Sequence, residues 1–171
     1  MRRSSPISIP DTVMRSTSLI SCRYAAAGVA AVVIEDKTFP KDSSLRPGGR
    51  QVLVPVREFQ GKIEAARFSD GPLVVARTEA LIAGLGQAEA LRRGVAYAEA
   101  GADAVLIHSK ENTPDEILEF ARAWPGQVPL VLVPTAYPQL SFAEIAALCS
   151  AAIWMGKQRQ SGWESGVAML A

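Results

Sequence analysis

The fold is decided by a pattern that occurs twice, as Tyr97-Ala-Glu-Ala-Gly-Ala-Asp-Ala-Val-Leu-Ile107 and as Tyr24-Ala-Ala-Ala-Gly-Val-Ala-Ala-Val-Val-Ile34. In both copies, a helix end is followed by a glycine suited to the left-handed position after a helix, and then by a strand. Repeated units of this kind indicate an α/β fold, which is either a barrel or a doubly wound sheet.

Five short apolar runs predict the strands of this fold, at residues 29–34, 72–76, 104–107, 129–133 and 151–154. Each run is continuously apolar rather than alternating, which is typical of strands buried on both faces in a parallel sheet. Helical patterns lie between them, over residues 87–100 and after two capping boxes that begin at Thr113 and Ser141. The sequence therefore predicts about five βα units, whereas eight would close a barrel.

Composition limits the possible functions. The chain has 171 residues, of which 49% are hydrophobic, and its formal net charge is +1. A charge this close to zero argues against binding to nucleic acid or to a membrane surface, and no apolar run reaches the ~20 residues that span a bilayer. The two cysteines, Cys22 and Cys149, are too few for a disulfide framework or a zinc site, and we expect free thiols in a reducing, cytoplasmic compartment.

Polar residues follow four of the predicted strands. Because the carboxyl ends of parallel strands meet at one edge of a sheet, these residues predict a site for an anionic substrate, a metal ion, or both. The alternative is that strand ends are simply where the chain returns to water. The groups are Glu35-Asp36-Lys37, Arg77-Thr78-Glu79, His108-Ser109-Lys110 and Pro134-Thr135.

Residue chemistry suggests individual roles at this edge. His108 is the only histidine, and it could polarise a developing enolate or carboxylate oxygen. Arg77 suits bidentate recognition of a carboxylate or phosphonate. Glu35 or Asp36 could hold Mg²⁺, directly or through water. The polar segment 38–51 is long enough to act as a lid, and the chain contains neither a Walker A motif nor a GxGxxG fingerprint.

Four motifs resemble those of the phosphoenolpyruvate mutase/isocitrate lyase superfamily, and within it the phosphonopyruvate hydrolase type. They are Glu-Asp-Lys-Thr-Phe-Pro-Lys-Asp-Ser-Ser-Leu-Arg at residues 35–46, Ala-Arg-Thr-Glu-Ala at 76–80, His-Ser-Lys at 108–110 and Val-Pro-Thr at 133–135. The resemblance covers about residues 24–154. It implies a Mg²⁺-dependent (β/α)8 TIM barrel, so we expect α/β architecture in the form of a partial TIM barrel with about five βα units.

The 38–51 segment indicates the reaction type. The carbon–carbon lyases of the superfamily carry a catalytic cysteine there, and this segment has none. The mutases carry an asparagine two residues after the lysine that corresponds to Lys41, whereas this chain has Ser43 and the hydrolase type has threonine. A hydroxyl at this place favours hydrolysis of the C–P bond of phosphonopyruvate to pyruvate and phosphate.

The resemblance also implies roles for single residues. Lys41, Ser43 and His108 are the expected catalytic residues. Arg77, His108 and Thr135 are expected to bind the substrate, a small phosphonate or 2-oxo acid. Glu35 is the expected Mg²⁺ ligand.

The two ends lack segments that the resemblance leads us to expect, including an Ala-Asp-x-Asp-Thr-Gly strand whose aspartates anchor Mg²⁺. Residues 1–23 are rich in arginine and serine, which is also typical of a disordered tail or a transit peptide. Because back-translation of residues 4–12 permits an Asp-Ile-Asp-Thr-Gly sequence in a shifted frame, we interpret residues 1–23 and 155–171 as out-of-frame ends flanking a 24–154 catalytic domain.

This interpretation predicts weakened Mg²⁺ binding and impaired activity. The alternatives are an inactive fragment that only self-associates, and an isomerase of the phosphoenolpyruvate mutase type. In each case we expect a homo-oligomer without nucleic-acid or membrane partners.

Overall fold

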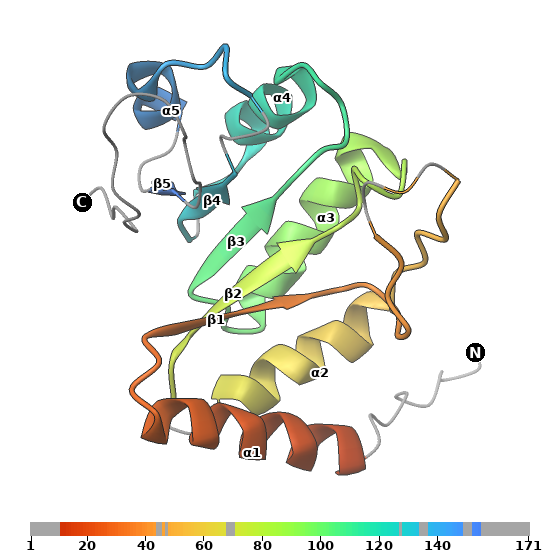
Figure 1. Cartoon of the computed structure of the whole chain (residues 1–171), viewed down its shortest axis with the longest axis vertical. Helices are drawn as coiled ribbons and strands as arrows, with labels where there is room; N and C mark the ends of the chain where they lie inside the picture. The colour runs from red at the N-terminus through yellow and green to blue at the C-terminus, as the bar shows by residue number, and fades with distance from the viewer. Residues whose placement is uncertain are drawn as a thin grey trace, which may run out of the picture.

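The computed structural model describes residues 11–43, 46, 48–67, 71–126, 128–133, 137–148 and 152–154. Helices and strands alternate along these residues (Figure 1). They are α1 (Asp11–Ala26), β1 (Ala31–Glu35), α2 (Val56–Arg67), β2 (Leu73–Thr78), α3 (Gly86–Glu99), β3 (Ala104–Ile107), α4 (Asp115–Ala123), β4 (Leu130–Leu132), α5 (Phe142–Leu148) and β5 (Ala152–Trp154).

The described strands form one sheet in the order β1-β2-β3-β4-β5, and every neighbouring pair is parallel. A doubly wound sheet reverses its strand order at a switch point, whereas a barrel adds each new strand beside the last. The strictly sequential order therefore confirms a partial TIM barrel, of which the described residues hold four βα units and a fifth strand. All five strands lie where the apolar runs predict them, within one or two residues at each end.

The repeated helix–glycine–strand pattern forms the same turn twice. Gly28 and Gly101 have φ values of +75° and +96°, in the left-handed region that favours glycine. After each glycine, the next amide donates back to the carbonyl of the repeated tyrosine, from Val29 to Tyr24 at 3.0 Å and from Ala102 to Tyr97 at 3.1 Å. The predicted helix end is confirmed in both copies, because these bonds satisfy carbonyls of the last helical turn.

The two predicted capping boxes have different outcomes. At Ser141 the box forms, since the Ser141 hydroxyl donates to Glu144 Oε2 at 2.7 Å and accepts from the Glu144 amide at 3.3 Å. At Thr113 the prediction is wrong. Helix α4 begins at Asp115, after Pro114, and no side chain caps it. The Glu116 carboxylate instead accepts a hydrogen bond from the Ser109 hydroxyl, which follows β3.

Helix α1 packs beside α2 through small polar side chains (Figure 1). The Ser18 hydroxyl donates to the Ala65 carbonyl at 2.7 Å, and the Ser21 hydroxyl donates to the Ala66 carbonyl at 2.9 Å. Two described apolar side chains of α1 face outward, since Leu19 is 67% exposed and Ile20 is 54% exposed. The expected domain boundary at residue 24 falls inside this helix. Among the described residues, no helix is both long and apolar enough to cross a membrane.

Alternation along the strands divides the sheet into two faces. One face packs against α2, α3 and α4, and it includes Val74, Ala76, Val105, Ile107, Leu130 and Leu132. The opposite face, here called the inner face, carries Val75, Leu106 and Val131, which form a smaller cluster. The prediction of strands buried on both faces is wrong for β1, where Val33 is 44% exposed, because β1 is the first strand of the described sheet.

Candidate active site at the strand ends

Three predicted site residues extend the inner face at the carboxyl ends of their strands. Arg77 follows Val75 by two residues, and His108 follows Leu106 by two residues, so alternation aims both to the inner face. Glu35 pairs directly with Arg77 in the register of β1 and β2. The structure therefore brings Glu35, Arg77 and His108 to one edge of three neighbouring strands.

Lys41 reaches this edge from the loop that follows β1. Its Nζ lies 2.9 Å from Glu35 Oε1, and Arg77 Nε lies 3.9 Å from Glu35 Oε2. Two cations thus flank one carboxylate that is itself only partly exposed. The Lys41 side chain remains 57% exposed, so the pair can separate at little cost when another ligand approaches.

A buried carboxylate lies behind Arg77. Glu79 is fully buried and forms ion pairs with Arg77 Nε and, at 3.0 Å, with Lys37 Nζ. Charges alternate along this row, from Lys41 through Glu35, Arg77 and Glu79 to Lys37. Arg77 contacts both Glu79 and Glu35 through the same nitrogen, Nε, so its terminal nitrogens remain for an anionic ligand.

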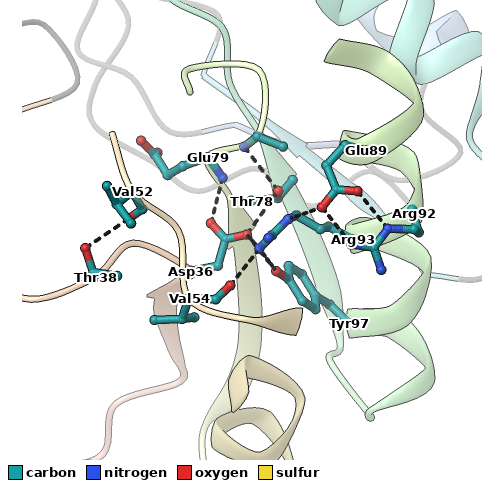
Figure 2. A network of polar contacts seen from close by, with 11 residues as sticks. Asp36, Thr38, Val52, Val54, Thr78, Glu79, Glu89, Arg92, Arg93 and Tyr97 are labelled. Atoms are coloured by element: carbon teal, nitrogen blue, oxygen red, sulfur yellow. Dashed lines mark hydrogen bonds and ion pairs between the residues drawn. The ribbon is translucent and has the colours of Figure 1, made fainter. Parts of the chain in front are cut away.

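Asp36 faces the helices, one residue away from Glu35 and on the opposite side of the sheet. Figure 2 shows its carboxylate between the end of β2 and helix α3. Oδ1 accepts from the Glu79 amide at 2.9 Å. Oδ2 accepts from Tyr97 Oη at 2.6 Å, from Arg93 Nη1 at 3.1 Å and from Thr78 Oγ1 at 3.3 Å. Because both oxygens are occupied, Asp36 is part of the scaffold, and Glu35 is the carboxylate that remains for a ligand.

Tyr97 supports Asp36 as a neutral hydrogen-bond donor. Burial raises the pKa of Tyr97 far above the ordinary phenol value, and the adjacent Asp36 carboxylate raises the pKa further. Its ring packs edge-on against Phe59 of α2, with centroids 4.6 Å apart. The hydroxyl therefore keeps its proton and its orientation over the working pH range.

The described residues between 38 and 52 belong to one loop that connects β1 to α2, here called the 38–52 loop. Lys37 and Leu53 form an antiparallel bridge at its base. Inside it, the Asp42 carboxylate accepts hydrogen bonds from the amides of Ser43 at 3.0 Å and Arg50 at 2.9 Å. The bond from the Arg50 amide is the largest contribution that lowers the pKa of Asp42. The Asp42 carboxylate thus connects two parts of the loop and fixes the backbone beside Lys41 and Ser43.

His108 is half-buried beside the charged row. Burial lowers the pKa of His108, the positive charge of Arg77 lowers it further, and Glu79 partly offsets both. The ring is therefore neutral at pH 7, with one N–H donor and one lone pair. Its Nδ1 is buried and has no hydrogen-bond partner among the described residues. Such a nitrogen is suited to receive or donate a hydrogen bond when a ligand arrives.

The remaining predicted residues are placed differently. Ser43 is exposed on the 38–52 loop, where its carbonyl accepts from Gln51 Nε2 at 3.1 Å. Thr135 lies outside the described residues. Arg93 and Tyr97 were not predicted to support the site, although they lie four residues apart on α3, at the spacing that puts two side chains on one side of a helix.

The described residues supply one open ligand for Mg²⁺. No group of three or more histidine, cysteine, aspartate or glutamate side chains in the described part of the chain could surround a metal ion. A hard carboxylate oxygen at a strand end suits Mg²⁺, which keeps several waters and takes one or two protein carboxylates. Glu35 therefore fits this ion in chemistry, but the described part of the chain does not surround it with three such side chains.

Comparison with known families identifies the class of protein. The family model for phosphoenolpyruvate phosphomutase matches residues 16–163. Solved structures with the same fold include a phosphonopyruvate hydrolase complex with oxalate and Mg²⁺, with a TM-score of 0.69 and 59% identity over 79% of this chain and 46% of the other. A phosphoenolpyruvate phosphomutase from Streptomyces platensis subsp. rosaceus has a TM-score of 0.76 and 49% identity over 82% of this chain and 50% of the other.

Curated relatives agree with this assignment. The chain is 66% identical over 134 residues to a phosphonopyruvate hydrolase from Variovorax sp. (strain Pal2), an alignment that covers 77% of this chain and 46% of the relative. It is 48% identical over 136 residues to a phosphoenolpyruvate phosphomutase from Streptomyces hygroscopicus, covering 77% and 43%. The chain thus spans about half the length of the curated relatives that it matches. It belongs to the phosphoenolpyruvate phosphomutase family, within the PEP mutase/isocitrate lyase superfamily.

Proposed function

We propose that the strand-end site binds phosphonopyruvate and takes part in hydrolysis of its C–P bond to give pyruvate and phosphate. The observation that carries this proposal is the row of Glu35, Arg77 and His108 under Lys41, in a chain 66% identical to a phosphonopyruvate hydrolase. Phosphonopyruvate carries a carboxylate and a phosphonate. Lys41 and Arg77, the two cations beside Glu35, match such a substrate in charge.

The reaction places separate demands on these residues. Water adds its oxygen to phosphorus as the C–P bond breaks, the bonding electrons remain on carbon as the enolate of pyruvate, and a proton then converts that carbon to a methyl group. Arg77 is suited to hold the carboxylate or phosphonate through its terminal nitrogens. Neutral His108 can hydrogen-bond the developing enolate oxygen without adding another positive charge beside Arg77.

The 38–52 loop supplies the remaining groups. Lys41 lies near enough to Glu35 to neutralise a phosphonate oxygen at the same edge. The Ser43 hydroxyl can donate to a phosphonate oxygen or orient the attacking water. Mg²⁺ held by Glu35, directly or through water, would neutralise enolate charge, and with one protein carboxylate we expect its affinity to be weak.

A direct assay tests this function. Pyruvate and phosphate release from phosphonopyruvate is measured with the full chain over a range of Mg²⁺ concentrations. Arg77→Ala and His108→Ala are expected to abolish turnover, because each removes a group that touches substrate. Arg92→Ala is the control, since Arg92 is an exposed cation on the surface of α3, where it pairs with Glu89. Absence of turnover at every Mg²⁺ concentration contradicts the proposal for this chain, and unchanged rates in both alanine variants contradict the site assignment.

The same assay separates the second candidate, which the 48% identity to a phosphoenolpyruvate phosphomutase favours. An isomerase would form phosphoenolpyruvate without releasing phosphate. A hydrolase would release one phosphate for each pyruvate formed. A chain without turnover that elutes as a large species in size-exclusion chromatography would support the inactive, self-associating fragment instead.

A further inference from the structure

Both ends of the 38–52 loop are held at one point of the scaffold. The Val52 carbonyl accepts hydrogen bonds from the Thr38 amide at 2.9 Å and from the Thr38 hydroxyl at 3.1 Å, which closes the loop at its base. One step further, the Val54 amide donates to the Asp36 carbonyl at 2.8 Å. The loop thus begins just after Asp36 and ends just before Val54, and these two residues are joined to each other.

Two side chains of helix α3, Arg93 and Tyr97, form hydrogen bonds at the base of the loop (Figure 2). Arg93 Nη1 lies 3.1 Å from Asp36 Oδ2 on the outgoing end of the loop and 3.1 Å from the Val54 carbonyl on the returning end. The same nitrogen donates to Tyr97 Oη at 3.0 Å, and Tyr97 Oη donates to Asp36 Oδ2 at 2.6 Å. One guanidinium therefore ties the two ends of the loop to each other and to the helix.

We propose that Arg93 and Tyr97 are positioning residues for the 38–52 loop, which hold its two ends through Asp36 and Val54 so that Lys41 lies over Glu35. This proposal rests on the proposed function for the reaction in which the loop takes part. The hydrogen bonds of Arg93 and Tyr97 to the loop ends do not depend on that function. Neither residue touches the strand-end row, so neither is proposed to contact substrate.

Burial supports positioning over simple stabilisation. Asp36 and Tyr97 are fully buried, and Arg93 is 7% exposed. A buried ion pair contributes little net stability compared with apolar side chains of the same volume, because both charges lose their water. The network makes directional bonds to the Val54 carbonyl and the Asp36 carboxylate at the loop base, which an apolar cluster in its place would not make.

The test uses Tyr97→Phe, Arg93→Met and Arg93→Lys in the full chain, with Arg92→Met as the control. Arg92 is the neighbouring residue of α3, its side chain is 58% exposed, and it pairs with Glu89 at the surface. Hydrogen exchange is followed at the amides of the loop base. Turnover of phosphonopyruvate is measured beside it, as kcat and KM separately.

We expect Tyr97→Phe and Arg93→Met to accelerate exchange of the Thr38 and Val54 amides at least about tenfold while exchange in α4 stays unchanged. We expect kcat to fall at least about fivefold with KM changed less than about twofold, because loop groups are misplaced while Arg77 still binds substrate. Arg93→Lys should recover part of both effects, since its ammonium can still donate to Asp36. Arg92→Met should match the unsubstituted chain.

Unchanged exchange at the loop base together with unchanged kcat in Tyr97→Phe and Arg93→Met overturns the proposal. Acceleration spread equally over the sheet and α4 also overturns it, because the network would then support the fold as a whole. If the unsubstituted chain shows no turnover, the proposed function fails, and the exchange measurement alone decides the positioning role.

Discussion

Replacing Glu79 with glutamine tests the buried end of the charged row. The side chain is fully buried, and its carboxylate joins Lys37 Nζ at 3.0 Å to Arg77 Nε. Glutamine has nearly the same shape, so Glu79→Gln removes the charge without opening a cavity. We expect a large loss of stability, because the Lys37 side chain, 3% exposed, stays buried without its carboxylate.

The expected magnitude follows from the geometry. Two unit charges 3.0 Å apart attract by about 5–6 kcal/mol at an effective dielectric constant of ~20. The Asp42 carbonyl, which accepts from Lys37 at 3.0 Å, remains, and the new amide oxygen can accept as well. These acceptors retain part of the interaction, so we expect a net loss of about 3 kcal/mol, at the lower end of the range for breaking a buried pair. A chain of this size should then melt about 6–12 °C lower.

The assay is urea unfolding followed by circular dichroism. Glu58→Gln is the matched control, because Glu58 pairs with Lys62 at 2.8 Å on the surface of α2 and should cost less than about 1 kcal/mol. Adding Lys37→Met to Glu79→Gln should recover most of the stability, since both buried charges are then removed. Two results would contradict this prediction. One is a loss of unfolding free energy in Glu79→Gln no larger than in Glu58→Gln. The other is a double variant in which the separate losses of Glu79→Gln and Lys37→Met add.

His108 is the only histidine, so its NMR ring resonance reports its titration. Burial and the charge of Arg77 should hold the pKa of His108 below the usual value of 6.5. Arg77→Gln should therefore raise the pKa of His108. Because the native pKa is lowered, the unfolded state takes up this proton first, and His108→Gln should reduce the loss of stability as pH falls below about 6.5. Gly94→Ala should destabilise by about 1 kcal/mol in urea unfolding despite better helix propensity, because the added Cβ would lie 2.8 Å from the Trp124 ring; an increase in stability would contradict this packing. Ile20→Lys should change the unfolding free energy by less than about 0.5 kcal/mol, and a loss above about 1 kcal/mol would mean that α1 buries this side chain.

The sequence predicted the parts of the structure that depend on local pattern. Continuous apolar runs located all five strands, because strands inside a parallel sheet are covered on both faces, although this cover is incomplete at β1. The tyrosine–glycine repeat predicted the helix ends before β1 and β3, because the turn requires the φ values that Gly28 and Gly101 adopt. The row of Glu35, Arg77 and His108 could be predicted as well, since parallel strands bring their carboxyl ends to one edge.

The sequence did not predict features that depend on partners far along the chain. Asp36 and Arg93 are 57 residues apart, and nothing near either residue indicates that they meet. The box at Thr113 failed because of a nearer competitor, since Glu116 bonds to Ser109, seven residues earlier, instead of closing the first turn of α4. Helix α2 was also not predicted, and of α1 only its end near Tyr24 was. Serine side chains of α1 make the contact with α2, so no apolar stripe marked the rest of this helix.

Strand alternation explains how one short segment serves both the site and the scaffold. Glu35 and Asp36 are adjacent carboxylates, yet Glu35 lies on the inner face between the exposed Lys41 and Arg77, and Asp36 is buried among four donors on the helix side. The sequence left open which of them could hold Mg²⁺, because residue type does not distinguish them. Their environments do, since a ligand can displace Lys41 from Glu35 by moving one exposed side chain, whereas freeing Asp36 would require α3, β2 and the base of the 38–52 loop to separate. The scaffold carboxylate therefore constrains the backbone on which the neighbouring site carboxylate is presented.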